Sequence, residues 1–556
     1  MIGQTARKGV AAAIAPGVAA IALNGALGTT AEAQFRDEDR TQLTFSNNYL
    51  GGALTVSPQA AYSDNINLAP SPNENGEFVL STLFSASGIV STKRFTGVAS
   101  GDLDFSLLTD EADFVVNQNL GGAGTATIAE NIAYLDVAGE TTRQLVGDNA
   151  AFSRNVNAAR NQRVNVNSFQ LSPYLNREFP SGAVAELRYR YSQAFTDQDN
   201  VGQTAGLLTD SRSQQVTAAF NTGPAYERLQ IGIAATGSRV DETGSLALDD
   251  FQYEQGTVVG DIEYALATRF AVTGAVGFDE IRSDAPPELI PADELSGFFW
   301  RAGFRARPGR KTNLRLEYGD RFGEGFINAQ FRYNFSERIY FVADAGRDFR
   351  SRAQNANVSF SSLQRRILRF ADSVREGEGQ SPEGIVSSSA RAGGRISARA
   401  VGVAATTRAS GSLFGVLDRG FIGGRISYQD EDFSFREIQT ATASVFGEHR
   451  LSRRLTAFGD AFLRFADTSV DLQSCLDNPS FFGVVATPVF SEAALCAGLV
   501  QTNGETTTVG GRIGARYRFF KNVAAFGQYS HTNRFSPEPV LEFSENVVTV
   551  GLTVDF

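Results

Sequence analysis

One stretch decides the fold of this chain: Val547-Val548-Thr549-Val550-Gly551-Leu552-Thr553-Val554-Asp555-Phe556. The valines and leucine at even positions share one parity with Phe556, whereas Thr549, Gly551, Thr553 and Asp555 share the other. Successive side chains of a strand point to opposite faces, so this segment predicts a strand with one apolar and one polar or small face. A soluble sheet can carry the same pattern as a membrane-spanning one. The rest of the chain has to decide whether the apolar face contacts a protein core or lipid.

The two-faced pattern recurs along the chain. Leu187 and Tyr189 alternate with Arg188 and Arg190, and similar alternation fills 298–305, 313–318, 327–334 and 509–519. A helix would need apolar residues at three-to-four spacing, which these segments lack. Repeated two-faced strands behind an export signal favour a β-barrel of a Gram-negative outer membrane, with its apolar face turned to lipid.

Turn residues predict how the strands connect. Tight connections are expected near 91–93, 180–182, 308–310, 336–337, 452–453 and 521–522, and longer polar stretches at 196–211, 281–295, 350–390 and 467–505. Outer-membrane barrels place short turns in the periplasm and long loops outside. We therefore expect an all-β, transmembrane, antiparallel up-and-down β-barrel with about 20 strands, in a range of roughly 18–22, and both termini in the periplasm. Pro58 and Pro173 should lie at strand ends or bulges, because proline cannot donate to a ladder.

Three segments make up the predicted domain organisation. Residues 1–33 are expected to be a secretory signal peptide, with Arg7 and Lys8 before an Ala-rich apolar run and Ala31-Glu32-Ala33 as the cleavage pattern. The apolar run is too short for a spanning helix and is interrupted by proline. Residues 34–50 are expected to form a short periplasmic leader, and residues 51–556 the outer-membrane barrel.

Composition excludes several classes of function. The chain carries a formal net charge of −11, and removing the signal, with its two basic residues and one glutamate, makes it −12. Such acidity argues against nucleic-acid binding, which needs basic surface. Cys475 and Cys496 lie in one inter-strand segment, and in an oxidising compartment they are expected to form a disulfide; two unpaired thiols are the alternative. The two histidines show no ligand spacing, so neither a metal nor another cofactor is expected.

Catalysis finds no support in the residues. His531 follows Ser530, but adjacent strand residues point to opposite faces, so the two should not form a nucleophile–base pair. His449 lies beside a tight turn on the predicted periplasmic side. The acidic run 430–432 is interpreted as a solvated loop rather than a carboxylate pair. The chain is therefore not expected to be an enzyme.

One segment departs from the strand pattern. In Ser362–Glu376, apolar residues recur at helical spacing, and Arg365, Arg366 and Arg369 occupy other faces. This short helix belongs to a long loop predicted to be extracellular. It could fold into the barrel mouth as a plug, or pack on the rim of neighbouring loops; the sequence leaves both open.

Short motifs carry a resemblance to a known group. Asn313–Gly323, followed by Ala329–Tyr333 and Phe335–Arg338, resembles the Tyr-Gly-Arg-Arg-Tyr/Phe-Gly hairpin of porin-like outer-membrane β-barrels associated with exopolysaccharide and PEP-CTERM loci. Tyr62–Ile66 and Leu451–Leu455 resemble the entry strand and a late turn of that group. The resemblance covers most of residues 50–556. It implies an outer-membrane location and a role around surface polysaccharide, and it supplies no catalytic residues.

If the apolar residues face lipid, the polar residues between them face the lumen. The candidate pore-lining residues are Arg188, Arg190, Arg301, Arg305, Arg315, Arg332, Arg464, Arg512, Arg516, Arg518, Glu186, Glu317 and Asp460. Singly, each could merely brace the wall in an ion pair. Together they predict a channel that favours small or anionic solutes, saccharides among them, because fixed charge in a narrow channel sets selectivity.

A non-conducting barrel for adhesion or polymer assembly is the alternative function. The expected partners are outer-membrane lipid, small solutes or polysaccharide, and the barrel assembly machinery through Phe556; nucleic acid is not among them.

Overall fold

The structure is a computed structural model. It describes residues 49–92, 94–109, 113–145, 157–159, 163–197, 210–223, 228–243, 251–285, 290, 292–336, 338–350, 404–433, 436–470, 473, 476, 491 and 504–556. The predicted signal peptide, most of the leader, the candidate helix with Arg365, Arg366 and Arg369, and both cysteines lie outside these residues. Those four predictions stay predictions.

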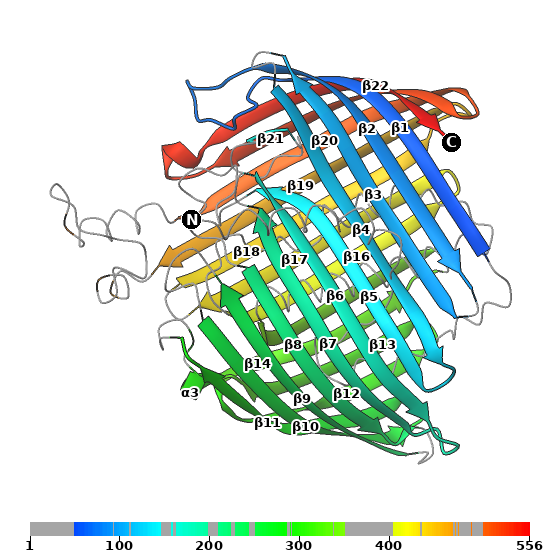
Figure 1. Cartoon of the computed structure of the whole chain (residues 1–556), viewed down its shortest axis with the longest axis vertical. Helices are drawn as coiled ribbons and strands as arrows, with labels where there is room; N and C mark the ends of the chain where they lie inside the picture. Colours follow the sequence, from blue (N-terminus) through cyan, green and yellow to red (C-terminus); the bar gives the residue numbers. More distant parts are fainter. Residues whose placement is uncertain are drawn as a thin grey trace, which may run out of the picture.

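Twenty-two antiparallel strands form one closed sheet (Figure 1). They are β1(Tyr49–Ser63), β2(Glu77–Ser91), β3(Phe95–Leu108), β4(Asp113–Ala129), β5(Ala133–Leu145), β6(Arg163–Glu178), β7(Val184–Asp197), β8(Asp210–Asn221), β9(Leu229–Thr243), β10(Phe251–Ala267), β11(Phe270–Ser283), β12(Gly297–Gly309), β13(Thr312–Arg321), β14(Glu324–Asn334), β15(Ile339–Arg350), β16(Ala404–Leu417), β17(Gly420–Phe433), β18(Arg436–Arg450), β19(Leu455–Val470), β20(Thr506–Phe520), β21(Val523–Phe535) and β22(Phe543–Asp555). Each strand pairs with the next along the chain, and β1 pairs with β22 to close the barrel, for example at Val56↔Val554. The prediction of an up-and-down barrel of about 20 strands is confirmed.

Helical structure in the described residues is limited to short pieces such as α3(Ala292–Leu295), between β11 and β12, and the 3-10 turn η5(Pro539–Leu541). No helix in these residues is both long and apolar enough to cross a membrane.

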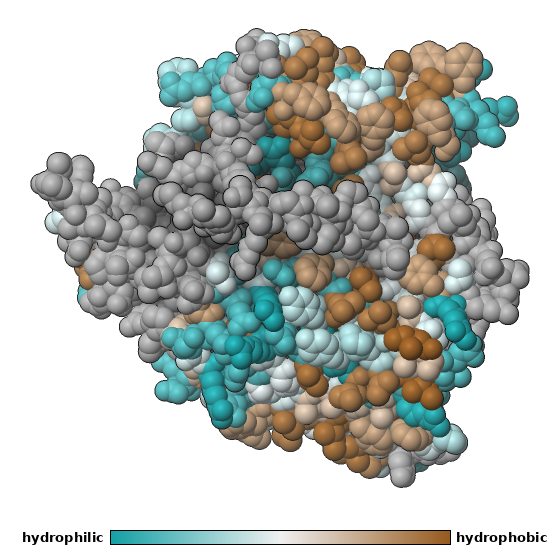
Figure 2. Space-filling view, in the orientation of Figure 1, coloured by the Kyte–Doolittle hydropathy of each residue, from teal (hydrophilic) through white to brown (hydrophobic). Residues whose placement is uncertain are grey.

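Apolar side chains cover the outside of the barrel. Ile513, Val550 and Leu552 are 68%, 55% and 46% exposed, and each belongs to the apolar parity of its strand. Figure 2 shows such apolar side chains exposed over the strands. Their exposure in a folded chain fits a barrel solvated by lipid, because in water so large an apolar surface would be covered by another layer. The predicted outward face is therefore correct.

Short turns gather at one end of the barrel. All six predicted tight connections lie at or directly beside a connection between strands, from the β2–β3 turn to the β20–β21 turn. Tyr49, the first residue of β1, and Asp555, the last residue of β22, lie at this same end, which we call the turn side. The long connections lie at the opposite end, the loop side, together with the two-residue connections 322–323 and 434–435.

Two sequence predictions about local structure are wrong. Pro58 and Pro173 lie inside β1 and β6, not at strand ends or bulges. The β1–β22 and β6–β7 ladders each skip two pairs there, yet the register on the two sides of each gap is the same. A proline lacks one donor and so interrupts only the ladder toward one neighbour, while the other neighbour keeps its pairing, as at Pro58↔Thr82.

The acidic run 430–432 is the second correction. It belongs to strand β17 rather than to a loop, and it alternates between faces: the Glu431 carboxylate accepts a hydrogen bond from Gln429 Nε2 at 2.7 Å, whereas Asp430 accepts one from the Tyr428 hydroxyl. Pairing with β16 and β18 holds these residues extended despite their low strand propensity.

Candidate functional site: the luminal wall

All thirteen candidate pore-lining residues lie on the parity that faces the lumen, opposite the exposed apolar residues. In β7, Glu186, Arg188 and Arg190 are buried, whereas Leu187 and Tyr189, between them, are exposed on the outside. In β12, Arg301 is buried beside the exposed Trp300. The alternation of the strand alone produces this segregation. That these residues line an open channel stays a prediction.

Arg188 lies at the centre of a buried ion-pair cluster on β5–β7. Its Nη1 lies 2.8 Å from Asp136 Oδ2, and its Nε lies 2.8 Å from Glu186 Oε1. It also donates to the Ser172 hydroxyl at 3.2 Å, and its guanidinium lies 3.8 Å from the centroid of the Tyr174 ring. With two carboxylates and a ring around it, Arg188 braces three strands rather than offering its charge to a solute.

Glu317 is the centre of a second cluster, on β12–β14. Arg315 donates to its Oε1 through Nε at 2.9 Å and Nη2 at 2.6 Å, Arg301 Nε lies 3.2 Å from Oε2, and Asn328 donates to Oε2 at 2.9 Å. The glutamate is 1% exposed. One carboxylate thus neutralises parts of two arginines on neighbouring strands, which are held close by the register.

Further pairs continue this pattern around the wall. Arg305 pairs with Glu263 of β10, and Arg512 Nε lies 3.0 Å from Asp460 Oδ1 across β19 and β20. Arg190 donates to Gln215 Oε1 at 2.5 Å. For these residues the bracing role that the sequence left open is visible in the structure.

The inner face of β19–β21 has a different charge balance. Its arginines are Arg464, Arg512, Arg516, Arg518 and Arg534, and its one carboxylate is Asp460. Arg464 and Arg534 lie near enough for their charges to interact. By contrast, the inner face of β10–β13 carries five arginines (301, 305, 307, 315 and 321) with four carboxylates (261, 263, 279 and 317). Excess positive charge is therefore concentrated on one sector, which we call the cationic sector (β19–β21).

Candidates near the turn side are more accessible. Arg518 is exposed and Arg516 is half-buried, both on β20. Arg332 is exposed on β14, donates to Asn334 Oδ1 at 3.3 Å, and lies 5.9 Å from the Tyr340 ring centroid. These three arginines sit where the wall meets the turn-side opening.

The sequence analysis missed several charged residues of the luminal wall. Asp136, Glu263 and Arg534 were not named, although each follows the inner parity of its strand. Asp279 was also missed; Arg321 donates to it through Nε at 2.7 Å and Nη2 at 2.9 Å. Extending the alternation of each strand to its full length would have found all four.

The loop side of the barrel is narrowed by an apolar cluster. It joins inner residues of β9–β11, such as Tyr253, with Ile290 and Leu295 from the β11–β12 connection and Phe349 from β15. The rings of Tyr253 and Phe349 lie 5.9 Å apart, although β10 and β15 are five inter-strand steps, about 24 Å, apart along the wall. The end of β15 must therefore leave the cylinder and lean inward. Consistent with this, the β14–β15 ladder ends at Ala329↔Ala345, while β15–β16 pairing continues to Arg350↔Ala404.

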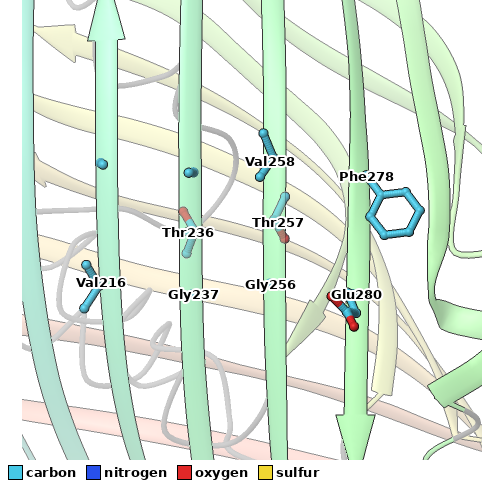
Figure 3. Close-up of a pocket in the computed structure, with 10 residues that line it drawn as sticks. Val216, Thr236, Gly237, Gly256, Thr257, Val258, Phe278 and Glu280 are labelled. Atoms are coloured by element: carbon cyan, nitrogen blue, oxygen red, sulfur yellow. The ribbon is translucent and has the colours of Figure 1, made fainter.

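A shallow depression on β8–β11 is not part of this site. Its volume is about 350 Å³, and Val216, Gly237, Gly256, Val258 and Phe278 are among the residues that line it (Figure 3). The two valines and the phenylalanine belong to the exposed outer set, so the depression opens toward lipid.

In the described part of the chain, His531 and Ser530 are not arranged as a nucleophile–base pair. His531 Nδ1 lies 2.9 Å from Asn546 Oδ1 of the next strand, on the outer parity, whereas Ser530 has the inner parity. Among the residues that the structure describes, no group of three or more His, Cys, Asp or Glu could hold a metal ion.

Comparisons with known proteins find only distant structural similarity. No family model matches the chain, and no curated protein matches it. Among solved structures, the siderophore receptor PirA from Acinetobacter baumannii shares 8% identity at a TM-score of 0.46, covering 91% of this chain and 81% of that one. The ferric-catecholate import receptor Fiu from E. coli K12 shares 9% at 0.44, covering 91% and 82%, and the FrpB iron transporter from Neisseria meningitidis shares 8% at 0.36, covering 92% and 82%. These similarities are too weak to carry an argument, and the chain's own geometry identifies it as a β-barrel of the outer-membrane type.

Proposed function

We propose that this chain is an outer-membrane conduit for small anionic solutes, with acidic saccharides as the favoured class. One observation supports this most directly: the inner parity of the cationic sector carries five arginines and a single aspartate. Charge fixed on a wall of low dielectric concentrates counter-ions along it and repels ions of the same sign. Ion pairs such as those of Arg188 and Glu317 stabilise the wall elsewhere, and the inner parity of β2–β4 carries Glu77, Asp102, Asp104 and Asp113 with no arginine, so anions would be attracted to the cationic sector alone.

The proposal places the barrel in the outer membrane with its turn side in the periplasm. Short turns on that side and long connections on the other follow the usual arrangement of outer-membrane barrels. The aromatic Phe556, 73% exposed, is the proposed recognition residue for the barrel assembly machinery, and lipid contacts the apolar outer face.

Planar bilayer recording tests this function. In a KCl gradient, the purified full chain should give a reversal potential of the sign that indicates anion preference. The double substitution Arg464→Gln and Arg534→Gln should move that potential toward zero. The control is Arg338→Gln on the turn-side rim, where the arginine pairs with the exposed Asp418. Cation preference, or no conductance, would overturn the proposal.

A non-conducting surface barrel is the second candidate. The apolar cluster at the loop side favours it, and outer-membrane transporters with 22 strands have a plugged lumen. Deleting residues 362–376, the segment expected to form a helix, distinguishes a plug from a helix packed on the rim. Loss of a plug should increase the conductance sharply, whereas loss of a rim helix should change it little.

A further inference from the structure

Four aromatic rings form a continuous row on the inner wall of β15–β18. Tyr340, Phe414, Phe421 and Phe446 each come from a different strand, in that order. Ring centroids are 5.8 Å apart from Tyr340 to Phe414, 5.9 Å from Phe414 to Phe421, and 6.4 Å from Phe421 to Phe446. We call this row the aromatic arc; it lies near the turn side, where β15 and β17 begin and β16 and β18 end.

The arc faces the lumen rather than lipid. Each phenylalanine adjoins an outward residue: Leu413, Ile422 and Val445 are 46%, 58% and 58% exposed. On the same face of β16, Ser410 donates to the luminal Asp344 at 2.8 Å, and Val416, two residues after Phe414, is apolar. Phe446 is itself 38% exposed, so the arc presents ring surface to the interior of the barrel.

Packing against glycines of the barrel wall accounts for only one of the rings in the arc. Phe446 covers Gly423, where an added Cβ would lie 2.5 Å from its ring, and this contact has a structural purpose. No ring atom of Phe414 or Phe421 is among the closest contacts that an added Cβ would make at the glycines of β16–β18. An aromatic ring in a wet lumen leaves apolar surface in water, which costs free energy unless a ligand covers it.

Cations accompany the rings. The Arg332 guanidinium lies 5.9 Å from the Tyr340 ring centroid. Arg425 of β17, four residues after Phe421 on the same face, is exposed and forms no ion pair within the described ranges. Glu448, on this face beside Phe421 in the ladder, is the carboxylate nearest to that ring in the register.

We propose that the aromatic arc binds acidic saccharides, with sugar rings stacked on Phe414 and Phe421 and sugar carboxylates directed to Arg425 and Arg332. One face of a pyranose presents C–H groups, which suit the electron-rich face of an aromatic ring. A guanidinium pairs well with a carboxylate. A row of rings with arginines beside it matches a chain of acidic sugars better than simple inorganic anions, which have no apolar face. The inference rests on the proposed function and narrows its substrate class.

Calorimetric titration of the detergent-solubilised full chain tests the arc without requiring conductance. The probes are tri-galacturonic acid, an acidic trisaccharide, and maltotriose, a neutral one. The variant Phe414→Leu with Phe421→Leu keeps apolar bulk but removes the ring faces. Its matched control is Phe331→Leu with Phe341→Leu, a ring pair 5.8 Å apart on the outer face of neighbouring strands.

The acidic trisaccharide should bind more tightly than the neutral one. The inner double variant should weaken it roughly tenfold or more, and Arg425→Gln should narrow the difference between the two sugars. The outer control should leave both affinities unchanged. Binding that is absent, or equal in the inner variant and its control, would overturn the inference. Conductance without sugar binding would overturn saccharide binding at the aromatic arc and leave the proposed conduit intact. Sugar binding without conductance would overturn the conduit and leave the binding site intact.

Discussion

Removing the Glu317 carboxylate should destabilise the barrel more than any single loss at an exposed ion pair. The glutamate is 1% exposed and holds Arg315, Arg301 and Asn328 through contacts of 2.6 to 3.2 Å. Glu317→Gln keeps the shape but removes one carboxylate from beside two partly or fully buried guanidinium groups. Breaking a buried pair on one side costs about 3–5 kcal/mol, and water in the lumen should bring the loss to the lower end, about 3 kcal/mol.

Urea unfolding in lipid vesicles, followed by the fluorescence of the chain's single tryptophan on β12, measures this loss. The control is Asp418→Asn, whose carboxylate pairs with Arg338 on the turn-side rim; because both side chains are largely exposed, little change is expected. If Glu317→Gln unfolds at the same urea concentration as the unmodified chain, the clusters do not brace the wall.

Three further predictions concern the wall and the cysteines. Val550→Arg on the outer face should cost about 2–4 kcal/mol if it lies near the bilayer midplane, measured by the same unfolding assay, whereas Thr549→Arg on the inner face should cost less; equal losses would contradict the assigned faces. Gly277→Ala would place a Cβ 2.3 Å from the Phe299 ring and should lose about 1–3 kcal/mol, whereas Gly260→Ala, with nothing within 4 Å, should be neutral or slightly stabilising. The two cysteines should resist alkylation until a reductant is added, as read by mass spectrometry of the purified chain; immediate labelling would show free thiols.

Alternation along each strand was enough to predict the fold and the faces. The apolar parities at 187–191, 298–304 and 509–519 all prove outward, because a strand leaves a side chain only two directions and lipid accepts only one kind. The turn residues likewise predicted which end carries the short connections. The strand number was predicted only within a range, since the Asn- and Gly-rich region 117–163 hides the boundaries of β4 and β5.

The sequence by itself determined the barrel class, the lipid-facing rows and the arginine-bearing inner parity, since these depend only on local periodicity. Only the tertiary structure decided which charges neutralise one another, as in Asp136 with Arg188, 52 residues apart. It also decided that Phe349 leans across to Tyr253 and that Phe414 and Phe421 become neighbours in one arc. Such contacts follow from register and barrel closure, and no single strand contains the information that sets them.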